Sequence, residues 1–270
     1  MLALFSVALA GQDNQVRNLE PSVIAERFGR LQSGEAERVA ALREMFAEAG
    51  CTGTHFTKQT VTGWKTPNLI CTLPGASKRT FVITAHYDKV KKGEGAIDNW
   101  SGAALLPSLY QTLAAKPRDF TYTFILFMGE ESGLVGSRYY VNQLTLPQRR
   151  NIAADINIDS VGLQGNINIW ASRAHPDLRT AAVLVASMVG VHLSAINAET
   201  LVRSGTPDSD SHAFVNIKIP VIDFHSISPA TMPLLHTAKD VPSAVDPATY
   251  YDTYRVLSAY LAYLDSTFEP

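Results

Sequence analysis

Apolar residues recur along this chain with two different periods, and the period separates predicted helices from predicted strands. In residues 34–49, the apolar side chains Val39, Leu42, Met45 and Phe46 recur at helical spacing. The same kind of pattern predicts the other helices at residues 21–31, 99–116, 132–144, 176–189 and 247–268.

Short runs rich in aromatic and β-branched residues predict the strands. The runs at residues 80–85 and 121–128 are apolar on both faces, as expected of parallel strands buried in a sheet. Residues 52–73 are rich in Thr and Val and carry turn residues, which predicts an antiparallel hairpin. Further strands are predicted at residues 152–158, 167–170 and 221–224.

The order of these elements predicts the fold class. Strands alternate with helices along most of the chain, which is the pattern of an α/β protein. We expect a three-layer sandwich in which helices flank a mixed, mostly parallel central sheet, with the hairpin at the sheet's edge.

Composition excludes several classes of protein. The 270 residues include 23 Lys and Arg against 25 Asp and Glu, so the net charge is −2, and 46% of residues are hydrophobic. The balanced charge argues against a nucleic-acid partner. The hydrophobic content argues against disorder. No run reaches the ~20 apolar residues that a membrane-spanning helix needs.

The N-terminus allows two interpretations. The first ten residues are apolar and end in Ala8-Leu9-Ala10, which resembles a signal-peptidase site, but a basic n-region and a longer apolar core are missing. Residues 1–12 are either the remnant of an export signal before a single domain at residues 13–270, or an apolar segment packed on that domain. On the first interpretation, we expect a periplasmic or secreted protein.

The two cysteines also leave two interpretations open. Cys51 and Cys71 flank the predicted hairpin and do not form a CxxC motif. In an exported protein they are suited to a disulfide. Otherwise they are two buried thiols.

Acidic and imidazole side chains follow nearly every predicted buried strand. His86 and Asp88 follow the first of these strands, Glu130 and Glu131 the second, and Asp159 the third. Two further candidates are Asp98, twelve residues past His86, and His236, beyond the last strand. Because open α/β sheets bind ligands at the carboxyl ends of their strands, we expect these side chains to converge.

Two histidines and three carboxylates suit a pair of zinc ions that share one carboxylate. Two Zn²⁺ ions would balance the charge of three carboxylates and one hydroxide, so the cluster would avoid the penalty of an uncompensated buried charge. Glu130 and Glu131 are neighbours at the end of an extended strand, where successive side chains diverge. One of the two can therefore bind metal while the other acts as a general base.

Five motifs together carry a family resemblance. They are HYD at 86–88, GAIDNWSG at 95–102, GEESGLVGS at 129–137, NID at 157–159 and HTAKD at 236–240. In this order they resemble the co-catalytic zinc aminopeptidase family, which also contains glutaminyl cyclases, glutamate carboxypeptidases and transferrin-receptor ectodomains. The resemblance implies the zinc-exopeptidase fold and an aminopeptidase that releases N-terminal residues from peptide substrates.

The resemblance also implies a role for each motif residue. Asp98 would bridge two zinc ions per chain, with the remaining ligands divided between them: Glu131 and His236 on one ion, His86 and Asp159 on the other. Glu130 would be the general base for a zinc-activated water. Asp88 would hydrogen-bond the second nitrogen of His86 and fix its tautomer.

One stretch departs from the family pattern. The family's Ser-Asp-His-x-x-Phe reads Ser209-Asp210-Ser211-His212-Ala213-Phe214 in this chain, so the histidine is displaced by one position. We do not assign His212 to the metal. His225, just past the last strand, is predicted to lie near the site as a packed histidine of open role. The other histidines are read as structural or surface residues: His55, His175 and His192.

Three alternatives remain at this level. A glutaminyl cyclase would usually carry an insertion after the Glu pair and a Trp before the last His-Thr, whereas this chain has no insertion and has Leu235 at that place. A non-catalytic binding domain would have lost ligands that this chain keeps. A carboxypeptidase for acidic C-termini would need pocket cations, for which Arg203 is a weak candidate. The sequence leaves the side-chain preference and the oligomeric state open, and a monomer is compatible with it.

Overall fold

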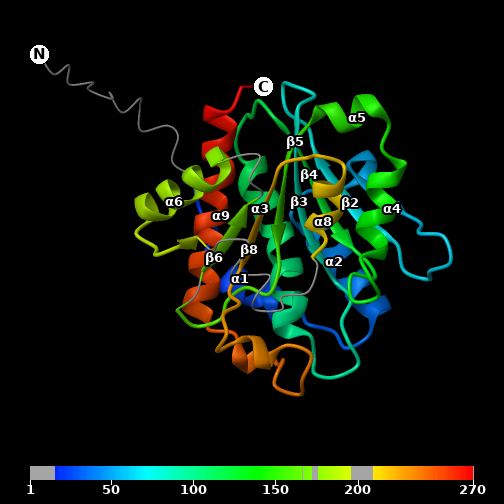
Figure 1. The fold of residues 1–270 in the computed structure, drawn as a ribbon, viewed down its shortest axis with the longest axis vertical. Helices are drawn as coiled ribbons and strands as arrows, with labels where there is room; N and C mark the ends of the chain where they lie inside the picture. Colours follow the sequence, from blue (N-terminus) through cyan, green and yellow to red (C-terminus); the bar gives the residue numbers. More distant parts are fainter. Residues whose placement is uncertain (1–15, 166, 172–175, 196–208, 270) are drawn as a thin grey trace, which may run out of the picture.

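A mixed eight-stranded sheet forms the centre of the computed structural model, which describes residues 16–165, 167–171, 176–195 and 209–269 (Figure 1). Its strands are β1 (Phe56–Gln59), β2 (Asn68–Leu73), β3 (Thr80–His86), β4 (Thr121–Phe127), β5 (Ile152–Ile158), β6 (Asn168–Ala171), β7 (Ser194–Ala195) and β8 (Val221–His225).

The strand order is β1-β2-β4-β3-β5-β8-β6-β7. Strand β3 pairs in parallel with β4 and β5, and β5 pairs in parallel with β8. The hairpin β1–β2 is antiparallel and joins β4 at one edge, while β6 runs antiparallel to β8 near the other. The predicted mixed, mostly parallel sheet with an edge hairpin is confirmed.

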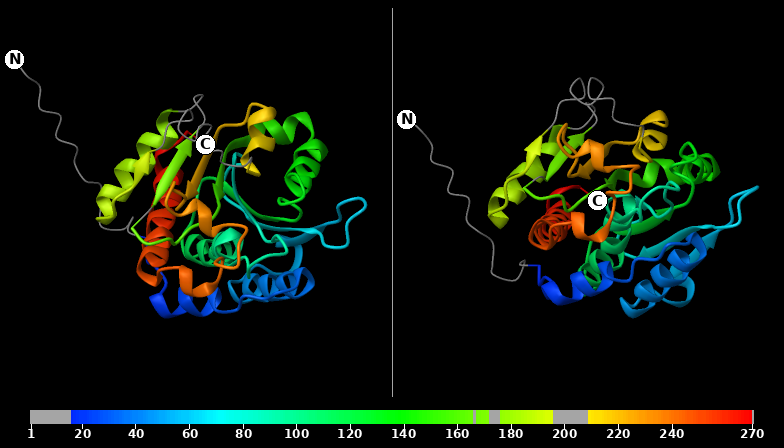
Figure 2. Two further views of the ribbon diagram at one scale, coloured as in Figure 1. Left: turned by 60° about the horizontal axis from the view of Figure 1, so that its bottom comes forward. Right: turned by 90° about the horizontal axis from the view of Figure 1, so that it is seen from below.

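Helices cover both faces of the sheet, so the predicted three layers are present (Figure 2). One face carries the larger apolar core, packed beneath α1 (Pro21–Phe28), α2 (Glu35–Glu48), α3 (Ser101–Ala114), α6 (Pro176–Val189) and α9 (Pro247–Thr267). The other face carries a smaller apolar cluster with α4 (Val135–Gln143) and α8 (Ser211–Asn216), and α5 (Leu146–Asn151) leads into β5. Single-turn helices η2 to η5 lie at Gly53–His55, Ala96–Trp100, Met232–Leu234 and Pro242–Ala244.

Helix ends follow local side-chain chemistry. Asp246 accepts a hydrogen bond from the Thr249 amide at 2.8 Å and begins α9. The predicted helix at 132–144 begins only at Val135, because Gly133 and Leu134 have positive φ angles of 98° and 61°. Those conformations belong to a turn, which keeps Glu130 and Glu131 in a loop. The short helices α5 and α8 were not predicted.

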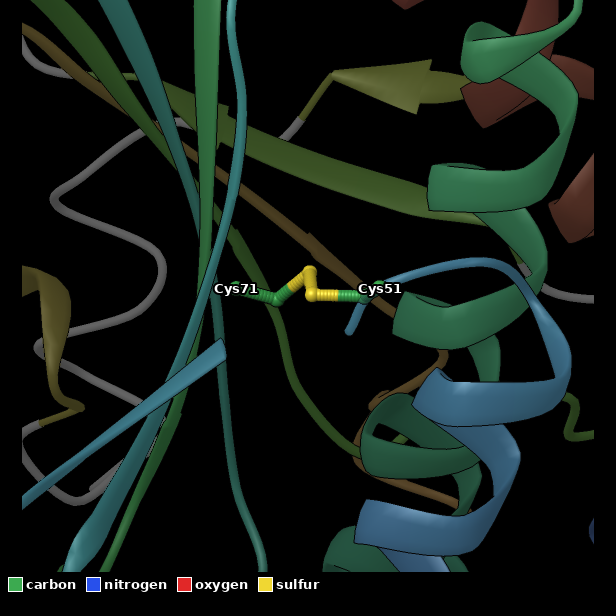
Figure 3. Close-up of a disulfide and its surroundings, with 2 residues drawn as sticks. All are labelled: Cys51 and Cys71. Atoms are coloured by element: carbon green, nitrogen blue, oxygen red, sulfur yellow. A yellow bond between two sulfur atoms is a disulfide. The ribbon is translucent and has the colours of Figure 1, made fainter. Parts of the chain in front are cut away.

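A disulfide joins Cys51, just after α2, to Cys71 on β2 (Figure 3). The two Cα atoms are 6.3 Å apart, within the normal range. Of the two interpretations of these cysteines, the disulfide is confirmed. It fastens the edge hairpin to the helix layer.

Some predictions fall outside the described part of the chain. These concern residues 1–12, His175 and Arg203. The division into residues 1–12 and one domain at 13–270 therefore stays a prediction. Across the residues that are described, no helix combines the length and apolar character needed to cross a membrane.

Candidate metal centre

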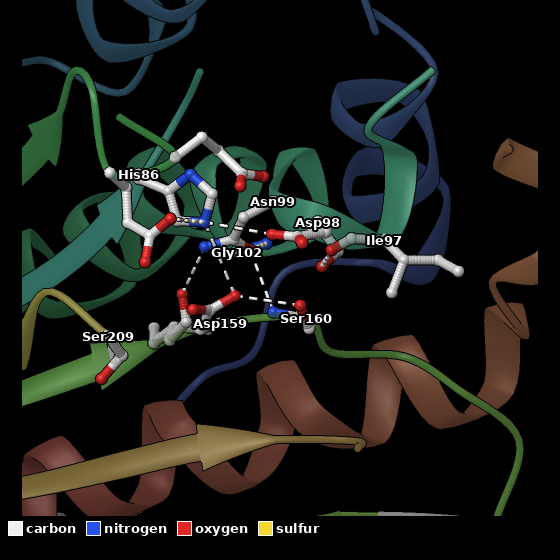
Figure 4. Close-up of polar contacts among 12 residues, drawn as sticks. His86, Ile97, Asp98, Asn99, Gly102, Asp159, Ser160 and Ser209 are labelled. Carbon is white, nitrogen blue, oxygen red and sulfur yellow. Dashed lines mark hydrogen bonds and ion pairs between the residues drawn. The ribbon is translucent and has the colours of Figure 1, made fainter. Parts of the chain in front are cut away.

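Five predicted ligands meet at the carboxyl ends of the central strands. Figure 4 shows three of them, His86, Asp98 and Asp159. His86 ends β3, Asp159 follows β5, and Asp98 lies in η3. Glu131 lies in the turn after β4 and His236 in the loop after η4. They form two groups that share Asp98: His86 with Asp159, and Glu131 with His236, each within 4.8 Å.

The first group has a buried histidine. His86 Nε2 lies 3.1 Å from Asp98 Oδ1 and 3.7 Å from Asp159 Oδ1, and the side chain of His86 is only 2% exposed. We call His86, Asp159 and the near oxygen of Asp98 the buried half of the centre.

The second group is open to solvent at its histidine. His236 Nε2 lies 3.0 Å from Asp98 Oδ2 and 3.2 Å from Glu131 Oε2, and the side chain of His236 is 45% exposed. We call His236, Glu131 and the far oxygen of Asp98 the exposed half. The two oxygens of Asp98 thus face different histidines, which is the arrangement that a bridging carboxylate requires.

The donor set fits zinc, because nitrogen and carboxylate oxygen are ligands that zinc accepts. Nε2 of His86 and Oε1 of Glu131 are buried without a hydrogen-bond partner. Buried polar atoms are normally paired, so atoms of this kind gathered around shared points indicate a place for a cation.

Charge in the metal-free centre shifts the pKa values of its groups. Burial alone would lower the pKa of His86, but the surrounding carboxylates, led by Glu130, raise it well above its usual range. Burial would raise the pKa of Asp98, yet the two histidines bring it below its usual range. In the absence of metal, these histidines therefore hold protons that a cation would displace.

Glu130 stands beside the ligands without belonging to either group. Its Oε2 lies 4.0 Å from His86 Nε2, and burial raises the pKa of Glu130 to about 10 in the metal-free protein. Neighbouring carboxylates add to this shift, among them that of Asp210. A carboxyl group with so high a pKa keeps its proton at neutral pH, so Glu130 can accept a proton only when bound cations lower its pKa.

Asp88 contacts both the histidine and the Glu pair. Its Oδ1 lies 3.4 Å from His86 Nδ1 and accepts a hydrogen bond from the Glu130 amide at 3.0 Å. Its Oδ2 accepts from the Glu131 amide at 3.2 Å. One carboxylate thus fixes the backbone of both glutamates, a role that the sequence did not indicate.

Two further side chains that hold the backbone of the site in place were not predicted from the sequence. The buried guanidinium of Arg38 donates to the carbonyls of Tyr87 and Glu94 at 2.9 and 2.6 Å, so it holds the chain between β3 and η3. Asp240 accepts from the amides of Ile97 and Asp98 at 2.6 and 3.4 Å. Asp240 belongs to the HTAKD motif, but Arg38 sits in an ordinary helical pattern and gave no signal.

A buried polar row crosses the sheet behind the metal centre. Thr84 Oγ1 donates to Asn157 Oδ1 at 3.0 Å, and Asn157 Nδ2 donates to Asp223 Oδ1 at 2.9 Å. Ser209 and Ser211 also donate to Asp223, each at 3.0 Å. The alternation of polar and apolar residues in 155–159 and 222–225 was the available signal, because it places the polar side chains of each strand on one face.

The remaining described histidines lie outside both ligand groups. His225 is buried, and its Nδ1 accepts a hydrogen bond from the Ile227 amide at 3.1 Å. Burial lowers the pKa of His225 to about 4. His212 packs beside Trp170 at 6.2 Å between ring centres, and His55 and His192 are exposed. Asp210 of the same motif is buried, and burial raises its pKa to about 7.

Comparisons with known proteins relate this chain to a peptidase family. The model of Peptidase family M28 matches residues 68–261. Aminopeptidase YwaD of Bacillus subtilis is 35% identical over 109 residues, which are 40% of this chain and 23% of that protein. Within this alignment, the chain spans well under half of its curated relative.

Solved structures of two kinds share the fold. The LapA aminopeptidase of Legionella pneumophila has a TM-score of 0.76 at 19% identity, with 93% of this chain and 73% of that chain covered. A glutaminyl cyclase from an Acidobacteriales bacterium has a TM-score of 0.73 at 17% identity, with 95% and 98% covered.

Proposed function

This chain belongs to peptidase family M28, and from that premise we propose that it is a zinc aminopeptidase that hydrolyses the first peptide bond of its substrates. The observation that carries the proposal is the pair of ligand groups that share Asp98, with Glu130 beside them. The aminopeptidase relatives support the same activity.

The ligand roles follow from the positions of the side chains. His86 and Asp159 would hold one zinc ion, Glu131 and His236 the other, and Asp98 would bind both. When bound, zinc supplies Lewis-acid polarisation of the scissile carbonyl and a lowered pKa for water at neutral pH.

The protein groups supply proton transfer and orientation. Glu130 would take a proton from the attacking water and deliver it to the leaving amine. Asp88 would keep His86 in the tautomer whose Nε2 carries the lone pair for the metal. Asp88 also accepts hydrogen bonds from the Glu130 and Glu131 amides, which would hold these two residues in position. Asp240, bonded to the Ile97 and Asp98 amides, would fix the bridging carboxylate.

Metal counting together with a substrate panel tests the proposal. The purified protein is analysed for zinc and assayed on aminoacyl-anilides and on a peptide with N-terminal Gln, before and after chelation. We expect two zinc ions per chain and chelator-sensitive release of the N-terminal residue, restored by zinc. Cyclisation of the Gln peptide without release of amino acids would show a glutaminyl cyclase instead. Zinc binding with neither reaction would leave a binding domain or a carboxypeptidase, which a peptide with an acidic C-terminal residue distinguishes.

We also propose that the protein works in an oxidising compartment after export. The Cys51–Cys71 disulfide supports this, since such bonds persist mainly outside the reducing cytosol. Cell fractionation with a thiol-labelling assay tests it. We expect the protein in the periplasmic or extracellular fraction, with both cysteines inaccessible to the label until reduction. Reduced protein confined to the cytosol would contradict the proposal.

A further inference from the structure

The loop of the edge hairpin lies at the same rim of the sheet as the metal centre. Strand β2 runs antiparallel to β4, so the start of β2 lies beside the carboxyl end of β4. Strand β1 is antiparallel to β2, and its last residue, Gln59, lies opposite Asn68. The connecting loop, residues 60–67, therefore extends beyond the carboxyl end of β4. The turn that carries Glu130 and Glu131 starts at the same end.

Trp64 in this loop lies against the turn of the two glutamates. A methyl group placed on the Cα atom of Gly129 would lie 3.9 Å from Cη2 of the Trp64 indole. Gly129 has a positive φ of 68° and immediately precedes Glu130. Because Gly129 has no side chain, the tip of the indole can approach the backbone of the turn closely. A large aromatic ring is thus placed beside the residue that precedes the proposed general base.

Hydrogen bonds hold the loop in this place. The hydroxyl of Tyr87, which follows β3, donates to the Pro67 carbonyl at 2.7 Å. Asn68 Nδ2 donates to the Gly136 carbonyl at 3.0 Å, and Asn68 Oδ1 accepts from the Met128 amide at 3.1 Å. The disulfide fastens the other end of the hairpin to the helix layer. The loop is therefore fixed relative to both β3 and the turn after β4.

The indole and the turn beside it are open to solvent. Trp64 is 39% exposed, and in the part of the chain that the structure describes it is the only aromatic member of the exposed large hydrophobic residues. Ser132 and Gly133 in the turn are also exposed. At the far side of the turn, His236 contacts Glu131, and the side chain of His236 is 45% exposed. A peptide bound at the exposed half of the centre can therefore lie across the turn and reach the indole.

The leaving part of a substrate is the part that comes nearest to this turn. In the proposed reaction, Glu130 delivers a proton to the amine nitrogen that leaves. That nitrogen belongs to the second residue of the substrate, and the Cα atom that carries the second side chain is bonded to it. The second side chain therefore starts near Glu130, whose neighbour Gly129 lies against the indole. An indole offers a broad apolar face on which another aromatic ring packs favourably.

We propose that Trp64 forms the subsite for the second substrate residue, and that it favours an aromatic side chain at that position. This inference rests on the proposed aminopeptidase function, because it concerns the specificity of the same site. The indole contacts the substrate away from the reacting bond, so it binds the ground state and the transition state equally. Its contribution therefore lowers KM for peptides with an aromatic second residue and leaves kcat nearly unchanged.

The test compares leucyl-phenylalaninamide with leucyl-alaninamide, which share the first residue and differ in the second side chain. Values of kcat and KM are measured for the wild-type protein, for Trp64→Ala, which removes the ring, and for Trp64→Phe, which keeps an aromatic face. Leu146→Ala is the matched control, because Leu146 is a 68% exposed apolar residue of α5, which precedes the amino end of β5. We expect the wild-type protein to prefer the Phe substrate. Trp64→Ala should lower the Phe:Ala ratio of kcat/KM by ~3–10-fold through KM, the value of an aromatic pair. Trp64→Phe and the control should retain most of the ratio.

Zinc content and binding without turnover separate the remaining outcomes. We expect Trp64→Ala to keep both zinc ions. An unchanged Phe:Ala ratio would overturn the proposal. Loss of zinc, or an equal fall in kcat for both substrates, would also overturn it, because Trp64 would then support the turn rather than contact the substrate.

Dipeptide analogues in which CH₂–NH replaces the scissile amide give the Phe:Ala ratio by calorimetry on the zinc-loaded protein. We expect the wild-type protein to bind the Phe analogue more tightly and Trp64→Ala to lose this preference. A wild-type protein that shows this preference but cleaves neither dipeptide amide would refute the aminopeptidase function while supporting the subsite. Cleavage of both amides with no preference in either measurement would refute the subsite alone.

Discussion

The two halves of the metal centre are built on different supports. In the buried half, His86 and Asp159 come from the ends of adjacent parallel strands, so the register of the sheet sets their separation. In the exposed half, Glu131 and His236 come from loops, and His236 has a positive φ of 57°. The loop ligand Glu131 is held by the hydrogen bond from its amide to Asp88. We therefore expect the buried half to bind metal more tightly than the exposed half.

The shared ligand gives the largest expected effect. Asp98→Ala removes a carboxylate oxygen from both halves. The expected difference in zinc affinity between the two halves should therefore disappear. We expect both zinc ions to be lost and aminopeptidase activity to fall to background, as measured by elemental analysis and anilide turnover. A variant that retains one tightly bound zinc would show that Asp98 serves only one half.

Glu130→Gln should leave zinc bound in both halves and remove only the proton acceptor. General-base catalysis contributes ~10²–10⁴-fold, so we expect kcat to fall by that factor with two zinc ions retained. Zinc analysis beside steady-state kinetics measures both quantities. Turnover near the wild-type level would mean that another group takes the proton.

Removal of one histidine at a time compares the halves directly. His236→Ala should lose one zinc ion and destabilise the metal-free protein less than His86→Ala does, because the side chain of His236 is 45% exposed and solvent screens its contact with Asp98. His86→Ala should also lose zinc, and should destabilise the metal-free protein by ~1–3 kcal/mol, because buried carboxylates lose their partner. Zinc titration and urea unfolding after chelation measure these effects. Equal destabilisation by the two variants would contradict the contrast.

The smallest effect concerns the pH dependence of stability without metal. The contact with Asp98 raises the pKa of His236 from 6.5 to about 9, and burial raises the pKa of Glu131 from 4.5 to about 7. A raised pKa in the folded state gives stability below the unfolded value, and this stability is lost as pH rises through the folded value. We expect the chelated protein to lose thermal stability from about pH 5 to 9, while added zinc stabilises it most at high pH.

Melting curves across this pH range, with chelator and with zinc, measure the dependence. His236→Ala should make the decline between pH 6.5 and 9 shallower without abolishing it, because the raised pKa values of His86 and Glu130 also act there. The decline below pH 6.5, to which Glu131 contributes, should remain. A decline of the same steepness above pH 6.5 in that variant would show that other groups cause it.

The sequence was sufficient to predict the elements that bring the site residues together. Apolar runs located the central strands, and the residues just after them include the ligands of the buried half. The family resemblance supplied the pairing of the other ligands and the distinction between Glu130 and Glu131. The limits of α4 were less accurate, because two positive φ angles in the preceding turn are not visible in a helical pattern.

The amino-acid sequence by itself determined the alternation of strands and helices, and with it the chemistry at the strand ends, because periodicity and residue type are local properties. Only the tertiary structure decided which distant groups support that chemistry. Arg38, on a separate helix, donates hydrogen bonds to the carbonyls of Tyr87 and Glu94. Asp223 accepts hydrogen bonds from side chains of three other residues, Asn157, Ser209 and Ser211. Such partners are set by strand order and helix packing, and these bring together residues whose separation along the chain carries no signal of contact.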